Sequence, residues 1–220
     1  MSDIFHEVDE EVRRERLQKL WDRYQNYIVA LLVVVVLGVA GWRAYDYLET
    51  KKAAESGSAF EVATRLADEG KHAEAEAAFA KIAAEGTAAY RNLARLRQAT
   101  ELAAGDPKAA IASYQGLAAD TTTPVELRDL AALRAGALQI DAGAYADAKA
   151  TLEPLTGEGR PYRHSARELI VLAAWRGGDT AEANRWAMLI MADGQTPPGT
   201  RTRVEMLIAL IAAGNTGNKG

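Results

Sequence analysis

The feature that most constrains this 220-residue chain is a short phrase that recurs four times. In each copy a glycine is followed five residues later by an alanine, and successive glycines lie 35, 38 and 35 residues apart. Glycine tolerates the left-handed backbone that ends a helix, and alanine lets the next helix approach its neighbour closely. The spacing therefore predicts an array of helix-turn-helix units. The predicted inter-helix packing positions are Gly70, Ala75, Gly105, Ala110, Gly143, Ala148, Gly178 and Ala183.

Apolar periodicity and helix-end signals give a coarse map of this array. Helix pairs are predicted at about residues 55–85, 88–119, 124–154 and 161–193, with a closing helix at about 200–213. A hydroxyl residue followed three positions later by glutamate predicts a capping box, which satisfies free amide groups at a helix start. Such boxes are expected at Ser58, Thr123, Ser165 and Thr202. Asp106 followed by Pro107 predicts a further helix start, as cap and first helical residue.

An uncharged segment precedes the repeats. Residues 24–42 carry no formal charge, and as a helix they span roughly 28 Å, close to the thickness of a bilayer core. Ten of the fourteen residues at 28–41 are Ile, Leu or Val, which favours membrane insertion over burial in a soluble core. Residues that suit the headgroup region flank the segment. These expected membrane-interface anchors are Tyr24, Tyr27, Trp42, Arg43 and Tyr45.

The flanking charges predict the topology. Seven acidic and five basic residues precede the apolar run, which favours an uncleaved signal anchor, with cleavage near Gly38 and Ala40 as the alternative. Five Lys or Arg before the span and three just after it favour a cytoplasmic N-terminus. The prediction is an all-α chain with a single transmembrane helix followed by an α-solenoid. Its expected parts are a cytoplasmic amphipathic arm at 1–23, the span at 24–47, a periplasmic repeat domain at 48–214 and a disordered tail at 215–220.

Composition argues against two classes of function. The net charge is -4 and no stretch is strongly basic, so the chain lacks the electrostatic footprint of a nucleic-acid binder. With no Cys and three widely separated His, we predict no catalytic, cofactor-binding or metal-ligating residues. The neighbours His164 and Ser165 supply neither the geometry nor the orienting carboxylate of a hydrolase. A hydrolytic or peptidoglycan-acting enzyme stays as an alternative that rests on isolated carboxylates and His164.

Binding through the helical array is the positive prediction. Curved solenoids expose a concave surface that is lined mainly by the first helix of each pair. Polar residues in the predicted first helices could therefore contact a partner. These candidate partner-binding residues are Asn92, Arg95, Arg134, Gln139 and Glu168.

The repeat period, the Gly-x-x-x-x-Ala turn and the aromatic residue or Leu that follows resemble the tetratricopeptide repeat. The anchor ending in Gly-Trp-Arg-Ala-Tyr at 41–45, Gly-Glu-Gly at 157–159 and Gly-Asp at 178–179 are similar to the ancillary subunit family of the bacterial SecYEG translocon. That resemblance extends from about Gln18 to about Ala213. It implies a scaffold in the bacterial inner membrane that assists newly exported proteins. The implied partners are the lipid bilayer, the translocon and a periplasmic chaperone of the prolyl isomerase type. A repeat adaptor in cell-envelope assembly or cell division is the alternative.

Overall fold

The chain forms helices joined by short turns in the computed structural model. The structure describes the backbone of residues 3–217 and the side chains of residues 20–213, together with those of Arg14 and Gln18. Within that range it is all-α, without strands. The helices are α1 (Asp3–Asp68), α2 (His72–Glu85), α3 (Ala88–Leu102), α4 (Pro107–Ala119), α5 (Val125–Asp141), α6 (Tyr145–Leu152), α7 (Arg163–Arg176), α8 (Thr180–Ala192) and α9 (Pro198–Gly217), with one 3₁₀ turn, η1 (Glu153–Leu155).

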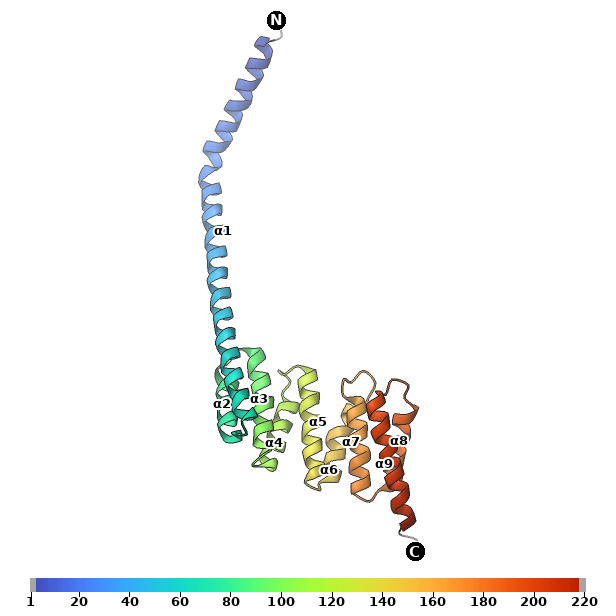
Figure 1. Ribbon diagram of the computed structural model, residues 1–220. Coiled ribbons are helices and arrows are strands. Elements are labelled where there is room, and N and C mark those ends of the chain that lie inside the picture. The colour runs from blue at the N-terminus through green and yellow to red at the C-terminus, as the bar shows by residue number, and fades with distance from the viewer. Residues whose placement is uncertain (1–2, 218–220) are drawn as a thin grey trace. The chain divides into compact units, whose positions relative to one another are not determined.

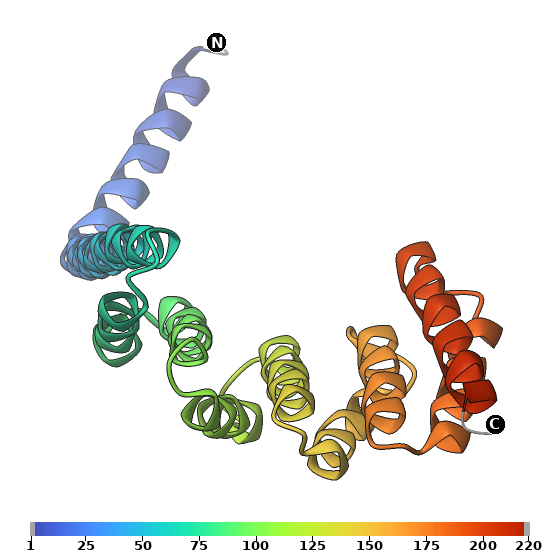
Figure 2. The same cartoon turned by 60° about the horizontal axis from the view of Figure 1, so that its bottom comes forward.

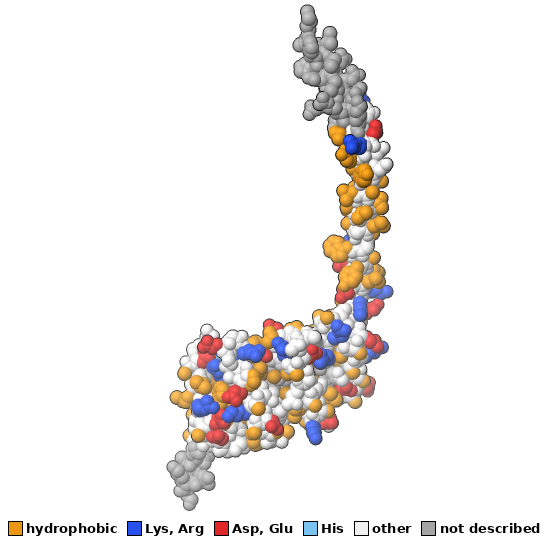
Figure 3. All heavy atoms as spheres, turned by 180° about the vertical axis from the view of Figure 1, so that it is seen from behind, with side chains coloured by type: hydrophobic (Ala, Val, Ile, Leu, Met, Phe, Trp, Pro, Cys, Tyr) orange, Lys and Arg blue, Asp and Glu red, His pale blue; other side chains and the backbone are white. Residues whose placement is uncertain are grey.

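The chain divides into two compact units, residues 1–52 and residues 53–220. We call them the N-terminal unit and the repeat domain. The N-terminal unit consists of the first part of α1, which is long and apolar enough to cross a membrane. None of its most apolar 18-residue stretch is buried by the rest of the protein, and Figure 3 shows this apolar band. Because water would face every side of that stretch, the lipid core is the environment that suits it.

The repeat domain contains the last part of α1, from residue 53, and the helices α2 to α9 (Figure 1). Successive helices pack side by side, and together they form an arc. Figure 2 shows α3, α5 and α7 on the inner side of the arc, while α2, α4, α6 and α8 lie on its outer side. The predicted helix pairs are therefore present, and the first helix of each complete pair lines the inner face.

Left-handed glycines follow the ends of α1, α5 and α7. Gly70, Gly143 and Gly178 have φ of 74°, 76° and 83°. The amide that follows Gly70 reaches back five residues to the Leu66 carbonyl at 2.9 Å, and the same pattern recurs after the other two glycines. This is the Schellman arrangement, in which the left-handed residue satisfies the last carbonyls of a helix.

The prediction of a left-handed turn residue is wrong for Gly105, the second glycine of the series. Its φ is not positive, and the Asp106 amide donates to the Leu102 carbonyl only four residues back. The α3–α4 turn therefore closes without a left-handed residue. Asp106 begins α4 as predicted, because its carboxylate accepts a hydrogen bond from the Ala109 amide at 2.9 Å, with Pro107 in the first turn.

The alanines that follow these turns lie at close helix crossings. Ala75, Ala110, Ala148 and Ala183 are fully buried. Three apolar clusters form the core along the arc, the largest of them around α7 and α8. Gly136 of α5 also lies at a close helix crossing. A Cβ at this position would lie 2.5 Å from the Leu152 side chain of α6. The inner and outer helices of that pair approach too closely for any side chain there.

The predicted capping boxes are wrong. Ser58 lies inside α1, which continues unbroken through the boundary between the two units. The helices α5 and α7 begin at Val125 and Arg163 without a side-chain cap. Thr202 lies within α9, and its hydroxyl donates to the Pro198 carbonyl. Instead Asp179 caps α8 by accepting from the Glu182 amide at 2.9 Å.

Two expected segments differ in extent from the helices. The arm at 1–23 and the span at 24–47 belong to one helix from Asp3, and most side chains of the arm lie outside the described residues. At the other end, α9 continues to Gly217, so the expected disordered tail is helical at 215–217. Residues 218–220 of that tail lie outside the described residues.

Candidate protein-binding surface

One polar contact joins each of α1, α3, α5 and α7 to the loop that lies before α3, α5, α7 and α9, respectively. Ser56 accepts from the Thr87 amide at 3.4 Å, and Asn92 accepts from the Thr123 hydroxyl at 3.4 Å. Asp129 and His164 occupy the corresponding places in α5 and α7. The Asp129 carboxylate accepts from Arg160 at 3.0 Å, and His164 Nδ1 lies 3.3 Å from the Thr196 hydroxyl. We call these four contacts the repeat links.

The structure assigns two of the candidate partner-binding residues to contacts between repeats. Asn92 belongs to a repeat link. Arg95 donates to Asp120 at 2.6 Å, just before α5. Hydrogen bonds from the Thr122 hydroxyl and from Arg95 hold the pKa of the Asp120 carboxyl far below its ordinary value. Both side chains therefore have structural partners within the protein.

A third candidate, Glu168 of α7, pairs with Arg203 of α9. Two charge-assisted hydrogen bonds join them, and the one between Arg203 Nη2 and Glu168 Oε2 measures 2.8 Å. A second pair with the same sequence separation joins Arg176 of α7 to Asp141 of α5 at 3.1 Å. These pairs join α7 to α9 and to α5, so each of the four charges has a partner of opposite sign within the repeat domain.

The two remaining candidates lie on α5. Gln139 is 5% exposed, and its side-chain oxygen has no hydrogen-bond partner among the described residues. Arg134 is exposed, and it makes no ion pair or hydrogen bond within the described part of the chain. Arg134 is therefore the candidate whose charge is left available to a partner, and it lies on an inner helix (Figure 2).

Sequence reasoning missed the densest polar cluster, which surrounds Asp193 after α8. Its carboxylate accepts from Arg163 at 3.1 Å and from Arg167 at 3.0 Å. Arg201 donates to the Asp193 backbone carbonyl at 3.2 Å. A backbone hydrogen bond from Gln195 lowers the pKa of the Asp193 carboxyl, and the neighbouring cations lower it further. The spacing of Arg163 and Arg167 places them on one helix face, but nothing in the sequence pairs them with a carboxylate 26 residues beyond Arg167.

His164 also belongs to this cluster, yet its contacts differ from those of a catalytic base. Both the Thr196 hydroxyl, at 3.3 Å, and the Asp193 carboxylate, at 4.0 Å, face the same ring nitrogen, Nδ1. A nucleophile–base–acid relay needs them on opposite nitrogens. The other nitrogen, Nε2, faces the Arg163 guanidinium at 3.2 Å, and the Thr196 hydroxyl donates to the Ile190 carbonyl. The His164 cluster thus connects α7 to the loop before α9.

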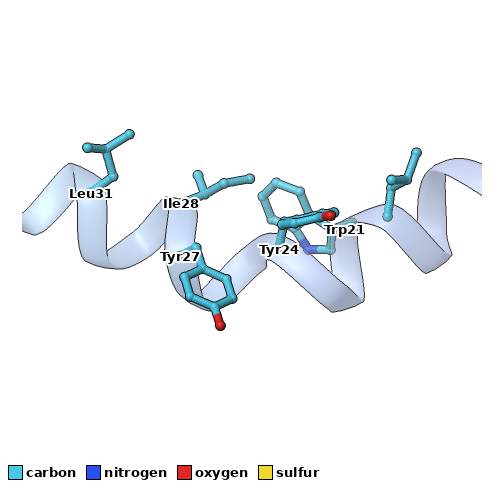
Figure 4. Close-up of a pocket in the computed structure, with 6 residues that line it drawn as sticks. Trp21, Tyr24, Tyr27, Ile28 and Leu31 are labelled. Atoms are coloured by element: carbon cyan, nitrogen blue, oxygen red, sulfur yellow. The ribbon is translucent and has the colours of Figure 1, made fainter.

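In the N-terminal unit, the expected interface anchors lie on the surface of α1. Tyr24, Tyr27, Trp42 and Tyr45 are all exposed, as is Arg43. Trp21 and Tyr24 lie close together on one side of the helix and Tyr27 points to another, as Figure 4 shows. With Leu20, Ile28 and Leu31 they line a shallow apolar groove. Amphipathic rings at the end of an apolar run suit the headgroup layer of a membrane.

A comparison with protein families identifies this architecture. The model of the tetratricopeptide repeat-like domain family matches residues 18–185, which is most of the chain. The chain therefore belongs to the tetratricopeptide repeat-like domain family. No curated protein and no solved structure matches it. The match begins within α1, before the apolar segment, and ends within α8.

Proposed function

We propose that this protein is a membrane-anchored scaffold for protein–protein interactions. The observation that carries the proposal is the pairing of an unburied apolar helix with an arc whose inner helix α5 presents the unpartnered Arg134. Repeat arcs bind partners along such inner faces. Anchoring confines the repeat domain to a thin layer at the membrane, which raises its effective concentration for neighbouring membrane complexes. This role requires positioning and no chemical step.

The finer assignment places the protein in the bacterial inner membrane, with a cytoplasmic N-terminus and a periplasmic repeat domain. In this assignment the partners are the SecYEG translocon and a periplasmic chaperone of the prolyl isomerase type, and the scaffold assists newly exported proteins. Its support is the resemblance of the motifs at 41–45, 157–159 and 178–179 to the ancillary translocon subunit. The excess of Lys and Arg before the span supports the orientation.

Copurification from mild detergent tests the proposal. The tagged full-length protein should recover translocon components and the chaperone under conditions that preserve the translocon complex. The variant Arg134→Glu should recover less of them, because it reverses the available charge on α5. Lys81→Glu is the matched control: it makes the same charge change at an exposed position of the outer helix α2, and it should recover as much as the wild type.

Copurification and crosslinking in intact cells can each contradict the finer assignment. If the wild type recovers neither translocon nor chaperone, the finer assignment is wrong. A crosslinking map dominated by cell-division or outer-membrane assembly proteins would instead assign the scaffold to cell-envelope assembly. Equal recovery by Arg134→Glu and Lys81→Glu would show that partners do not use this part of the inner face.

A further inference from the structure

The last helix of the array, α9, exposes an apolar face at the end of the arc (Figure 2). Met206 and Leu210 are 56% and 51% exposed, and Thr202 and Ala209 are exposed as well. Residues that lie three, four or seven positions apart share one face of a helix. We call these four residues the α9 face.

The opposite side of α9 is also apolar. Val204 and Ile211 are buried in the largest core cluster, and Leu207 and Ile208 pack against it. Between residues 204 and 214 the only charged residue is Glu205. A helix that is apolar all round is normally covered on every side. The neighbours of α9, which are α7 and α8, nevertheless leave the α9 face uncovered.

The repeat period indicates what kind of neighbour the α9 face lacks. Gly214 follows Gly178 by 36 residues, so the period continues into α9. The residues of α7 that lie 36 positions before Thr202, Met206 and Ala209 are Ala166, Ile170 and Ala173. All three are buried, and two further helices follow α7 in the array. No described helix follows α9, which continues to Gly217. The α9 face is therefore where a further helix would pack.

The chemistry of the α9 face suits a second copy of itself. Around a two-fold axis each residue approaches its own counterpart, so a charge near the axis would be repelled by its copy. None of the four residues of the α9 face is charged. The Thr202 hydroxyl already donates to the Pro198 carbonyl. Burial of the α9 face would therefore leave no charge and no side-chain donor unpaired.

The order of large and small residues also fits an antiparallel pair of α9 helices. With the two-fold axis between residues 207 and 208, Met206 would lie opposite Ala209 of the second copy, and the same contact would recur across the axis. Glu205, at the edge of the α9 face, would lie opposite Leu210 and not opposite its own counterpart. A long side chain then meets a small one, which permits close packing.

We propose that the α9 face binds the α9 face of a second copy of this chain, in an antiparallel pair with two-fold symmetry. The pair covers α9 on the side that the array leaves bare, and both copies bury the same apolar surface. This inference goes beyond the proposed scaffold function, because it gives each assembly two repeat domains. Two inner faces in one assembly raise the avidity for a partner that offers two binding segments.

Light scattering on the purified full-length protein in detergent, with the detergent mass subtracted, tests the inference. One chain has a mass of 23.7 kDa, and the wild type should contain two chains per particle. Met206→Glu puts a carboxylate from each copy beside the axis, where like charges repel each other. This variant should pair at least about tenfold more weakly than the wild type.

Met188→Glu is the matched control. It makes the same change at a methionine of α8 that is 65% exposed and lies outside the α9 face, and its pairing should stay within about twofold of the wild type. Equal pairing by the Met206 and Met188 variants would contradict the assignment to α9. A single-chain mass for the wild type throughout a concentration series overturns the inference.

Complementary charges separate pairing from misfolding. Two copies with different tags are coexpressed and purified through one tag, and the other tag is then quantified. Recovery of the second copy should fall at least about tenfold when both copies carry Met206→Glu, or when both carry Met206→Lys. Met206→Glu in one copy with Met206→Lys in the other should restore recovery, because opposite charges then meet across the axis. A folding defect would not be restored in this way, and failure of the mixed pair to recover contradicts direct contact between the two faces.

Another occupant of the α9 face would give a different result. A partner of other sequence would copurify with the wild type and be lost in Met206→Glu, while the purified wild type would stay a single chain. That result overturns the second copy as the occupant. Copurification with Arg134→Glu reports on the proposed function separately, because Arg134 belongs to α5. A wild type that pairs but recovers no translocon or chaperone would therefore contradict the finer functional assignment and leave the pairing intact.

Discussion

The Arg160 guanidinium lies 3.0 Å from the carboxylate of Asp129, although 31 residues separate them in sequence. This contact is one of the repeat links. Its counterparts at Ser56, Asn92 and His164 use a hydroxyl, an amide and an imidazole in the same structural role. The same placement of the contact thus recurs along the arc while the chemical groups differ, and each link joins one of α1, α3, α5 and α7 to the loop before the next odd-numbered helix.

The link at Asp129 should contribute measurably to stability. Arg160→Gln removes the cation and leaves a carboxylate whose side chain is only 6% exposed. An unsatisfied buried acceptor costs about 1–3 kcal/mol, so urea unfolding followed by circular dichroism should show a loss of that order. Arg134→Gln is the control, because this exposed arginine has no described partner, and its free energy of unfolding should change by less than about 0.5 kcal/mol. Equal losses in the two variants would show that the contact between Arg160 and Asp129 does not contribute to the free energy of unfolding.

The turn glycines offer a matched pair of substitutions. Gly143→Ala puts a Cβ on a residue with φ of 76°, which should cost about 1–2 kcal/mol. At Gly105 the backbone is not left-handed and an added Cβ meets nothing within 4 Å. Gly105→Ala should therefore leave stability unchanged or raise it by up to about 1 kcal/mol, because it restricts the unfolded chain. Thermal melts of both variants check this, and similar destabilisation by both would contradict the turn assignments.

These two glycines also show how far sequence reasoning reaches. The period of the Gly-x-x-x-x-Ala phrase predicted the order of the helices and the approximate position of each turn. It did not predict the backbone at Gly105, because the α3–α4 turn has four residues between its helices, 103–106, whereas each of the three turns with a left-handed glycine has three. The Gly-x-x-x-x-Ala phrase therefore predicts the position of each turn more reliably than the backbone conformation of the turn.

The capping boxes failed for a related reason. A hydroxyl residue and a glutamate three positions later satisfy the pattern at many places inside helices. Ser58 lies within α1, because the apolar helix of the N-terminal unit continues without a break into the repeat domain. Burial and long-range pairing also escape a local pattern, as Gln139 and Asp193 illustrate. Of the predicted binding residues, only Arg134 is left both exposed and without a described partner.

Overpacking a helix crossing tests the packing role of the buried alanines. Ala110 of α4 is fully buried, and α4 packs against α3 and α5. Replacing it with leucine forces extra methylenes into a filled space, so Ala110→Leu should destabilise the protein by about 1–3 kcal/mol. Ala112→Leu lies two residues away on the exposed side of the same helix and should change stability by less than about 0.5 kcal/mol. Unchanged urea unfolding of Ala110→Leu would show that the register is misassigned.

The cluster around Asp193 predicts how stability depends on pH. The folded-state pKa of His164 is lowered from its ordinary value of 6.5. As pH falls below that value, the unfolded chain takes up a proton that the folded protein resists, so stability decreases. The Asp193 carboxyl, whose pKa is also lowered from 3.8, adds a loss of the same sign at lower pH. Melting temperatures should therefore fall between pH 7 and pH 5, and the fall should be smaller in His164→Gln. An identical pH profile in that variant would contradict the assignment.

The orientation in the membrane can be tested with single cysteines, because the natural chain has none. Five Lys or Arg precede the span and three follow it closely, and positive residues are retained on the cytoplasmic side during insertion. In bacterial spheroplasts, a membrane-impermeant maleimide should therefore label Asn184→Cys, which lies exposed on α8. It should label Gln18→Cys only after the membrane is permeabilised. The reverse pattern would place the repeat domain in the cytoplasm. A mature chain that retains Asn184→Cys but lacks Gln18→Cys would show that the apolar segment is a cleaved signal peptide and that no anchor remains.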